Sequence, residues 1–183
     1  MQRRDWLVGG VGAAAALVGA GWAWRRQATP VESATPPQTS DGDDLSALWT
    51  ASFTRPDGGE LKMADLRGKP LLINFWATWC APCVKEMPDL DRFQQDFAKQ
   101  GWQVVGLAID GPTPVREFLQ KVKISFPIGL AGLEGTDLGR ALGNKQGGLP
   151  YTVVIGRTGK PLWRKLGGSH YDELAAKAAE WSS

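Results

Sequence analysis

The chain has 183 residues, which allows one domain of ordinary size and an additional segment but not two full domains. Residues 1–40 hold four of its 21 basic side chains and two of its 19 acidic ones, so the remainder is electrically neutral. A neutral body without a Lys/Arg cluster lacks the charge that binding to nucleic-acid phosphates requires. Length and charge therefore exclude multidomain machinery and nucleic-acid binding.

Two cysteines and one histidine limit the chemistry further. A four-ligand Cys/His zinc site needs more such residues, unless carboxylates or a second chain contribute, so we expect no metal site. One disulfide cannot be the main source of stability in a chain of this length. With 43% apolar residues, the fold must rest on a hydrophobic core.

Residues 1–26 have the features of a signal sequence or membrane anchor. Within them, residues 6–24 form an uncharged run of 19, flanked on each side by a pair of arginines. As a helix this run would span about 28 Å, near the thickness of the hydrocarbon core of a bilayer. Eleven of its residues are Gly or Ala, so it is only mildly hydrophobic. Cleavage after Ala20, retention as an anchor, or burial as a core helix are the alternatives.

The start of the chain, from Gln2 to Leu7, resembles the twin-arginine export signal, in which two arginines precede an aromatic residue and a leucine. Paired arginines before an apolar run also occur in signals of the general export pathway. By either route we expect the rest of the chain outside the cytoplasm, on the periplasmic side of the cytoplasmic membrane.

Residues 27–44 are rich in Pro, Ser, Thr and acidic residues and poor in large apolar ones. Such a stretch cannot bury enough apolar surface to offset the entropy lost on ordering, so we expect a disordered tether. From residue 45 to residue 183, short apolar runs alternate with amphipathic stretches, which predicts one α/β domain.

The first half of this domain is predicted to contain a strand over 48–53, a turn over 55–59 with its return over 60–63, a central strand over 71–76, a helix over 80–100 and a strand over 104–109. The second half is predicted to contain a helix opened by Thr113 with Pro114 in its first position, a short strand over 126–130, a small helix over 137–142, and a hairpin of strands over 151–155 and 161–166. A last helix is expected from Ser169 to Trp181, with Asp172 completing a weak capping box.

The sequence Trp79-Cys80-Ala81-Pro82-Cys83 lies between the expected central strand and the long helix. Cys80 falls at the helix N-terminus, where unpaired N–H groups and the helix dipole stabilise a thiolate, the species that attacks disulfides. Cys83 lies one turn inside the helix, near enough to bridge back to Cys80, and we expect it to be the more buried cysteine. A structural bridge or half of a metal site are alternatives, but this order of strand, Trp, Cys, Cys and helix favours a redox dithiol.

Further motifs surround this dithiol. They are Asn74-Phe75-Trp76-Ala77-Thr78 before it, Glu86 and Pro88 after it, and Gly148-Leu149-Pro150-Tyr151-Thr152. With them, residues 45–183 resemble the membrane-tethered, extracytoplasmic thiol-disulfide oxidoreductases of the TlpA/ResA type. The resemblance implies a thioredoxin-like fold, that is, a central mixed β-sheet flanked by helices, with an N-terminal β-hairpin and an inserted strand-helix element. It also implies that Pro150 is cis and faces the dithiol, and that the backbone of Leu149 pairs with the substrate.

One departure from cytoplasmic thioredoxins bears on the mechanism. Those proteins have a buried aspartate six residues before the first cysteine, whereas this chain has Asn74, which cannot exchange a proton. Glu86, three residues past Cys83 and on nearly the same helical face, matches the buried glutamate of the ResA-like branch. A carboxyl in an apolar site resists ionisation and can exchange a proton near neutral pH. The alternative is a solvated helix carboxylate.

The candidate catalytic residues are therefore Cys80, Cys83, Glu86 and Pro150, and Trp79 and Leu149 are the candidate substrate-binding residues. Pro88 matches the helix-kinking proline of thioredoxins and is assigned a structural role. His170, the only histidine, is expected to be solvated at the start of the last helix.

The first functional hypothesis is a reductant outside the cytoplasm whose redox group is the Cys80–Cys83 disulfide, with no other cofactor. The resemblance implies disulfides in exported proteins as substrates, apocytochrome c being typical, and a membrane thiol reductase of the DsbD/CcdA type as electron donor. A peroxiredoxin-like peroxide reductase is an alternative, although its reactive cysteine stands in a Thr-x-x-Cys setting without a C-x-x-C partner. A copper-binding chaperone is another, since two thiolates suit Cu(I), but related chaperones space their cysteines by three residues and add a histidine.

Overall fold

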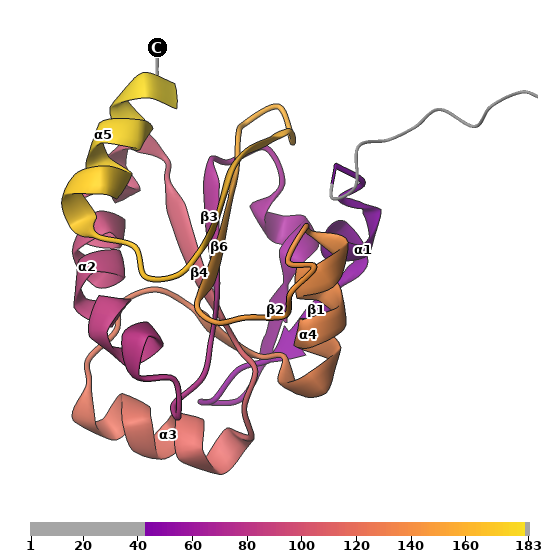
Figure 1. Cartoon of the computed structure of the whole chain (residues 1–183), viewed down its shortest axis with the longest axis vertical. Coiled ribbons are helices and arrows are strands. Elements are labelled where there is room, and N and C mark those ends of the chain that lie inside the picture. The colour runs from indigo at the N-terminus through magenta and orange to yellow at the C-terminus, as the bar shows by residue number, and fades with distance from the viewer. Residues whose placement is uncertain (1–42, 182–183) are drawn as a thin grey trace, which may run out of the picture. The chain divides into compact units, whose positions relative to one another are not determined.

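The computed structural model of the chain describes residues 43–181 (Figure 1). The predicted signal or anchor over 1–26 and nearly all of the predicted tether over 27–44 lie outside the described residues. Within residues 43–181, none of the helices is both long enough and apolar enough to cross a bilayer.

The described residues form five α-helices, two short 3-10 helices and seven strands. The helices are α1 (Ser46–Thr50), η1 (Met63–Leu66), α2 (Ala81–Phe97), η2 (Ala98–Gln100), α3 (Pro112–Lys121), α4 (Gly132–Ala141) and α5 (Tyr171–Trp181). The strands are β1 (Ser52–Thr54), β2 (Glu60–Lys62), β3 (Leu71–Trp76), β4 (Gln103–Ala108), β5 (Ile128–Leu130), β6 (Tyr151–Ile155) and β7 (Pro161–Leu166).

All seven strands join in one sheet with the order β2-β1-β5-β4-β3-β6-β7. β4 runs parallel to both β3 and β5, and the other neighbouring pairs are antiparallel. The predicted α/β class with a mixed sheet is confirmed, as are the leading hairpin of β1 and β2 and the added strand β5 with helix α4.

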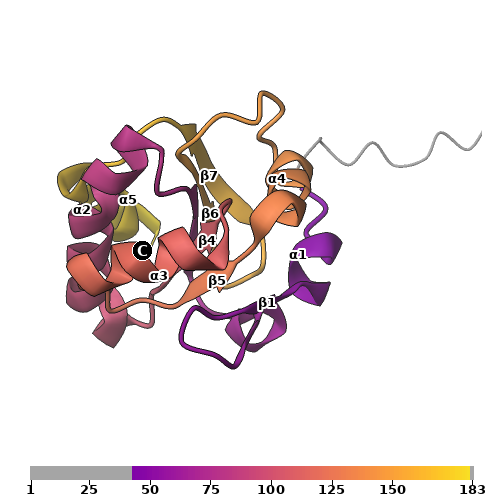
Figure 2. The same ribbon diagram turned by 90° about the horizontal axis from the view of Figure 1, so that it is seen from below.

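The central strand β3 explains why helices cover both faces of the sheet. All six of its residues are buried, and successive strand residues point to opposite faces. Ile73 and Phe75 therefore pack in a core with α1 and α4, whereas Leu72 and Trp76 pack in a second core with α2, α3 and α5. Figure 2 shows these two groups of helices on opposite sides of the sheet.

Helix α2 follows the predicted pattern closely. Its buried side chains recur at helical spacing and include Met87, Leu90 and Phe93, which face the second core. The helix continues through η2 to Gly101, whose φ of 90° lies in the left-handed region that glycine adopts easily. The predicted range of 80–100 therefore agrees with α2 and η2 to within one residue.

One predicted strand and the starting residues of two predicted helices require correction. The strand predicted over 48–53 is wrong in its first half, because residues 46–50 form α1, where a helical turn buries Leu45 and Leu48, three positions apart, in the first core. Strand β1 begins only at Ser52. Helix α3 begins at Pro112, not with Pro114 in first position, since Gly111 occupies the cap and proline needs no N–H at the first helical position. Helix α5 begins at Tyr171 instead of Ser169.

The small helix predicted over 137–142 is also longer than expected, because α4 starts at Gly132. The glycines within α4 have a packing reason. A Cβ at Gly135 would lie 2.5 Å from Cβ of Ala131 and 2.5 Å from Cδ1 of Ile109, so a larger residue would force neighbouring atoms to shift.

Candidate active site

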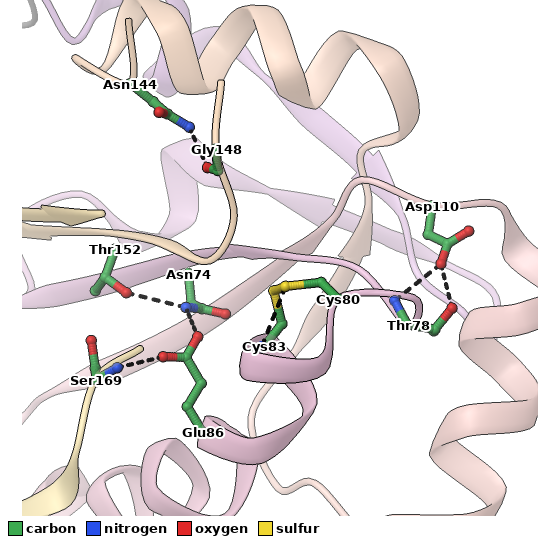
Figure 3. The surroundings of a disulfide bond; sticks show 10 residues. All are labelled: Asn74, Thr78, Cys80, Cys83, Glu86, Asp110, Asn144, Gly148, Thr152 and Ser169. Carbon is green, nitrogen blue, oxygen red and sulfur yellow. Dashed lines mark hydrogen bonds between the residues drawn. A yellow bond between two sulfur atoms is a disulfide. The ribbon is translucent and has the colours of Figure 1, made fainter. Parts of the chain in front are cut away.

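The two cysteines are joined by a disulfide at the N-terminus of α2 (Figure 3). Cys80 is the residue that caps the helix, and its Sγ accepts a hydrogen bond from the backbone N–H of Cys83 at 3.3 Å. Cys80 is 6% exposed and Cys83 is fully buried, as expected from the spacing. Only the sulfur of Cys80 can therefore be approached from outside, and the N–H groups of the first turn stabilise negative charge on it.

The loop before Cys80 is held by Asp110, which follows the parallel neighbour of β3. The backbone N–H and the hydroxyl of Thr78 both donate to Oδ2 of Asp110, at 3.1 and 2.5 Å. Asp110 follows β4, which runs parallel to β3, so the ends of both strands meet at the same edge of the sheet. The sequence reasoning did not identify Asp110, although an acidic residue directly after a buried parallel strand was a usable signal.

Glu86 is buried on the inner face of α2, with 3% of its surface exposed. Its Oε1 accepts a hydrogen bond from Nδ2 of Asn74 at 2.7 Å, and its Oε2 accepts one from the backbone N–H of Ser169 at 2.6 Å. Burial raises the pKa of Glu86 to about 7, against the opposing effect of these two hydrogen bonds and of the charges on Lys165 and His170. The solvated alternative for Glu86 is therefore wrong, and this carboxyl can take or release a proton near neutral pH.

Asn74 connects Glu86 to the sheet. It stands opposite Thr152 in the register of β3 and β6, and its Nδ2 also donates to Oγ1 of Thr152 at 3.1 Å. Its Oδ1 is buried without a hydrogen-bond partner among residues 43–181, and in Figure 3 it lies on the side of the disulfide. Asn74 thus fixes the position of the Glu86 carboxyl in the layer behind the cysteines.

Leu149 and Trp79 share a pocket with Phe75, whose side chain lies on the face of the sheet opposite to that of Asn74. The peptide bond between Leu149 and Pro150 is cis, as the resemblance implied. Trp79 is 69% exposed, and both it and Leu149 line a pocket of about 190 Å³ together with Phe75 and Ile109. The structure therefore brings the two candidate substrate-binding residues to one largely apolar pocket, and Trp79 directly precedes Cys80 in the chain.

His170 is solvated, as predicted, with 72% of its side chain exposed and its Nδ1 lying 3.5 Å from Oδ2 of Asp89. Its neighbour Ser169 is not the capping residue that the sequence suggested. The Ser169 N–H binds Glu86, and its hydroxyl is buried without a hydrogen-bond partner among the described residues. In residues 43–181, no cluster of three or more His, Cys, Asp or Glu residues is arranged to hold a metal ion.

A disulfide at the N-terminus of the helix that follows the central strand, with a cis proline directly before the antiparallel neighbour of that strand, is the site of the thioredoxin-fold thiol-disulfide oxidoreductases. Residues 37–179 match the family model described as Redoxin. The chain belongs to the Redoxin family.

Relatives whose names are known are also thiol-disulfide oxidoreductases. The thiol-disulfide oxidoreductase ResA of Bacillus cereus is 29% identical over 120 residues, which cover 64% of this chain and 66% of the relative. ResA of Geobacillus thermodenitrificans is 33% identical over 105 residues, which cover 57% of this chain and 58% of the relative. The chain thus spans just under two thirds of the first of these relatives and less of the second.

Among solved structures, the thiol:disulfide interchange protein of the thioredoxin family from Chlorobium tepidum superposes with a TM-score of 0.64 and 28% identity. The superposition covers 73% of this chain and 93% of that one. The predicted resemblance to thioredoxin-fold oxidoreductases of the TlpA/ResA type is confirmed.

Proposed function

We propose that the chain is an extracytoplasmic thiol-disulfide oxidoreductase that reduces disulfides in exported proteins through Cys80 and Cys83. The observation that carries this proposal is the layered arrangement of the site. The sulfur of Cys80 lies at the helix N-terminus, and Cys83 is fully buried in the first turn of the helix. Glu86 lies buried on the same helix with a pKa of about 7. The names of the relatives support the reaction class, and the apolar run over 6–24 supports the location.

The reaction begins from the reduced dithiol. The Cys80 thiolate attacks one sulfur of the substrate disulfide, so a mixed disulfide forms and the first substrate thiolate leaves. Cys83 then attacks the Sγ of Cys80, which releases the second substrate thiolate and forms the Cys80–Cys83 disulfide. The dithiol loses two electrons and the substrate disulfide gains them.

Glu86 takes the proton of Cys83 during the second step. A carboxylate with a pKa near 7 is ionised in part of the molecules at neutral pH, so it can act as the base for a buried thiol. A Cys83 thiolate and a Glu86 carboxylate in one low-dielectric layer raise each other's pKa, so their titrations are coupled. Asn74 keeps the carboxyl in place and takes no proton itself.

Substrate recognition is assigned to Leu149 and Trp79. The backbone of Leu149 pairs with the extended substrate, and the apolar pocket beside Trp79 receives a substrate side chain next to the reacting cysteine. The resemblance further supports apocytochrome c as a substrate and a membrane thiol reductase of the DsbD/CcdA type as the electron donor.

Single-turnover kinetics test the chemical proposal. The reduced full chain is mixed with a protein disulfide between pH 5 and 9, and the rate of closure of the Cys80–Cys83 disulfide is recorded. We expect one ionisation near neutral pH that is missing in Glu86→Gln and retained in Glu117→Gln, a matched change at an exposed glutamate of α3. An unchanged profile in Glu86→Gln would remove Glu86 from the proton transfer.

Two further measurements test the proposed direction of electron transfer and the proposed location of the protein in the cell. Equilibration of the full chain with glutathione buffers should give a potential more reducing than that of glutathione, whereas a value near the roughly −120 mV of a disulfide-forming oxidant would reverse the proposed direction. A reporter that is active only in the cytoplasm, fused after Ser183, should stay silent in cells. Activity of this reporter would contradict the extracytoplasmic location.

A further inference from the structure

A row of three opposed residues crosses the sheet beside Glu86. Asn74 of β3 stands opposite Thr152 of β6, and Thr152 stands opposite Lys165 of β7. Residues directly opposite each other in antiparallel strands have their side chains on the same face of the sheet. Because Asn74 binds Glu86 of α2, Lys165 lies on the same face as the buried carboxyl.

Lys165 is held there by the last helix. Its Nζ donates to Oε2 of Glu173 in α5 at 2.5 Å, and the two side chains are only 27% and 33% exposed. A partly buried charge is less screened by water and salt than a fully solvated one. Lys165 therefore presents a positive charge to the layer that contains Glu86, and Glu173 opposes part of that charge.

The other charged groups around Glu86 lie nearer to solvent. His170, in the segment before α5, is 72% exposed and faces Asp89 of α2. On α2 itself, Lys85 precedes Glu86 but is exposed. The positive charges that favour the ionised form of Glu86 are those of Lys165 and, to a smaller degree, His170. Cys83 is the remaining titratable group of this layer when the dithiol is reduced.

We propose that Lys165 is a positioning residue for proton exchange at Glu86, and that its ion pair with Glu173 sets how readily the buried carboxyl gives up its proton. The inference rests on the proposed function of Glu86 as the proton acceptor of Cys83. Lys165 contacts neither substrate nor cysteine in this role; it acts through the electric field at the carboxyl.

The two members of the ion pair have opposite effects in this scheme. Loss of the positive charge at Lys165 leaves the negative charge of Glu173 facing the site, which favours protonated Glu86. Loss of the negative charge at Glu173 leaves Lys165 unopposed, which favours the carboxylate. If the ion pair only held α5 against β7, either substitution would break the same contact. Both substitutions would then shift the titration midpoint of Glu86 in the same direction.

The titration of Glu86 in the oxidised full chain tests this inference directly. Carbon-13 NMR of labelled glutamate carboxyls follows Glu86, whose resonance is assigned by its absence in Glu86→Gln. We expect Lys165→Met to raise the midpoint and Glu173→Gln to lower it, each by about half a pH unit, the scale of a partly screened unit charge. Lys85→Met, which removes a solvated charge next to Glu86 in the chain, should leave the midpoint unchanged.

Lys165→Arg provides the conservative control, since it keeps the charge and should keep the midpoint even if the ion pair changes its geometry. The rate of disulfide closure in the reduced chain should shift along the pH axis in the same directions. Midpoints that move in the same direction in Lys165→Met and Glu173→Gln, or that do not move, would overturn the inference. If Glu86→Gln also left the kinetic profile unchanged, the proposed role of Glu86 would fail as well, so the two failures are distinguishable.

Discussion

The substitution Glu86→Gln should change the pH dependence of stability in the oxidised protein. The pKa of Glu86 is about 7 in the folded chain against an ordinary 4.5, because burial disfavours the charged form. The folded state therefore binds this proton more tightly than the unfolded state. The stability contribution of Glu86 is fully present below about pH 4.5 and is lost as the pH rises through about 7.

The size of this effect follows from the pKa difference. One pKa unit corresponds to about 1.4 kcal/mol, so Glu86 should lower the free energy of unfolding by about 3 kcal/mol between these two pH values. The introduced glutamine is neutral at every pH, so the free energy of unfolding of Glu86→Gln lacks this dependence on pH. It offers only one acceptor oxygen to the two donors from Asn74 and Ser169, and the mismatch costs about 1 kcal/mol or more at all pH values.

Urea unfolding of the oxidised full chain, followed by tryptophan fluorescence at pH 4, 6 and 8, measures the free energy of unfolding that tests this prediction. The stability of Glu86→Gln relative to the unsubstituted chain should rise with pH and level off above neutrality. Glu117→Gln should show no such change, because its carboxyl is exposed. A stability difference in Glu86→Gln that stays constant from pH 4 to pH 8 would refute the reasoning.

Three other predictions follow from local packing and exposure. Gly106→Ala would place a Cβ 2.6 Å from Cδ1 of Ile128 and within 3.2 Å of the buried rings of Trp76 and Phe126, so it should lower the free energy of unfolding by about 1–3 kcal/mol in urea unfolding. Gly139→Ala, whose new Cβ would have its nearest neighbour at 3.7 Å, should be neutral or raise stability by about 0.5–1 kcal/mol. Equal effects of the two substitutions would contradict the packing argument. Asp110→Ala removes the acceptor for two hydrogen bonds from the loop before Cys80 and should lower stability by about 1–3 kcal/mol, so an unchanged urea midpoint would contradict this anchor. Trp79→Ala should change stability by less than about 0.5 kcal/mol but slow the reduction of a protein disulfide more than that of a small disulfide, and equal slowing would remove its role in substrate binding.

Local sequence patterns were sufficient to predict the dithiol and its surroundings on α2. Cys80, Cys83 and Glu86 are spaced by three residues, so one helix places them in successive turns without reference to the rest of the fold. The burial of Glu86 could be expected because the helix face that carries it also carries Met87 and Leu90. The cis bond before Pro150 came from the family resemblance and could not be obtained from local pattern.

Contacts that depend on strand register and loop paths could not be predicted in this way. Ser169 lies 83 residues from Glu86 in the chain, and its local motif suggested a helix cap, whereas the tertiary hydrogen bond determined its position. Lys165 and Thr152 acquire their places beside the site only through the pairing of β7 with β6 and of β6 with β3. The short helix α1 was mistaken for a strand, since a single turn with Leu48 as its buried centre has too little periodicity to be distinguished.

The central claim is that Cys80 attacks the substrate and Cys83 resolves the mixed disulfide. Mass spectrometry of covalent adducts formed by the full-length variants with disulfide-containing proteins tests it most directly. Cys83→Ser should accumulate mixed disulfides through Cys80, because the resolving sulfur is missing, while Cys80→Ser should form none, because Cys83 is fully buried. Adducts that form through Cys83 in Cys80→Ser and are absent in Cys83→Ser would contradict the account.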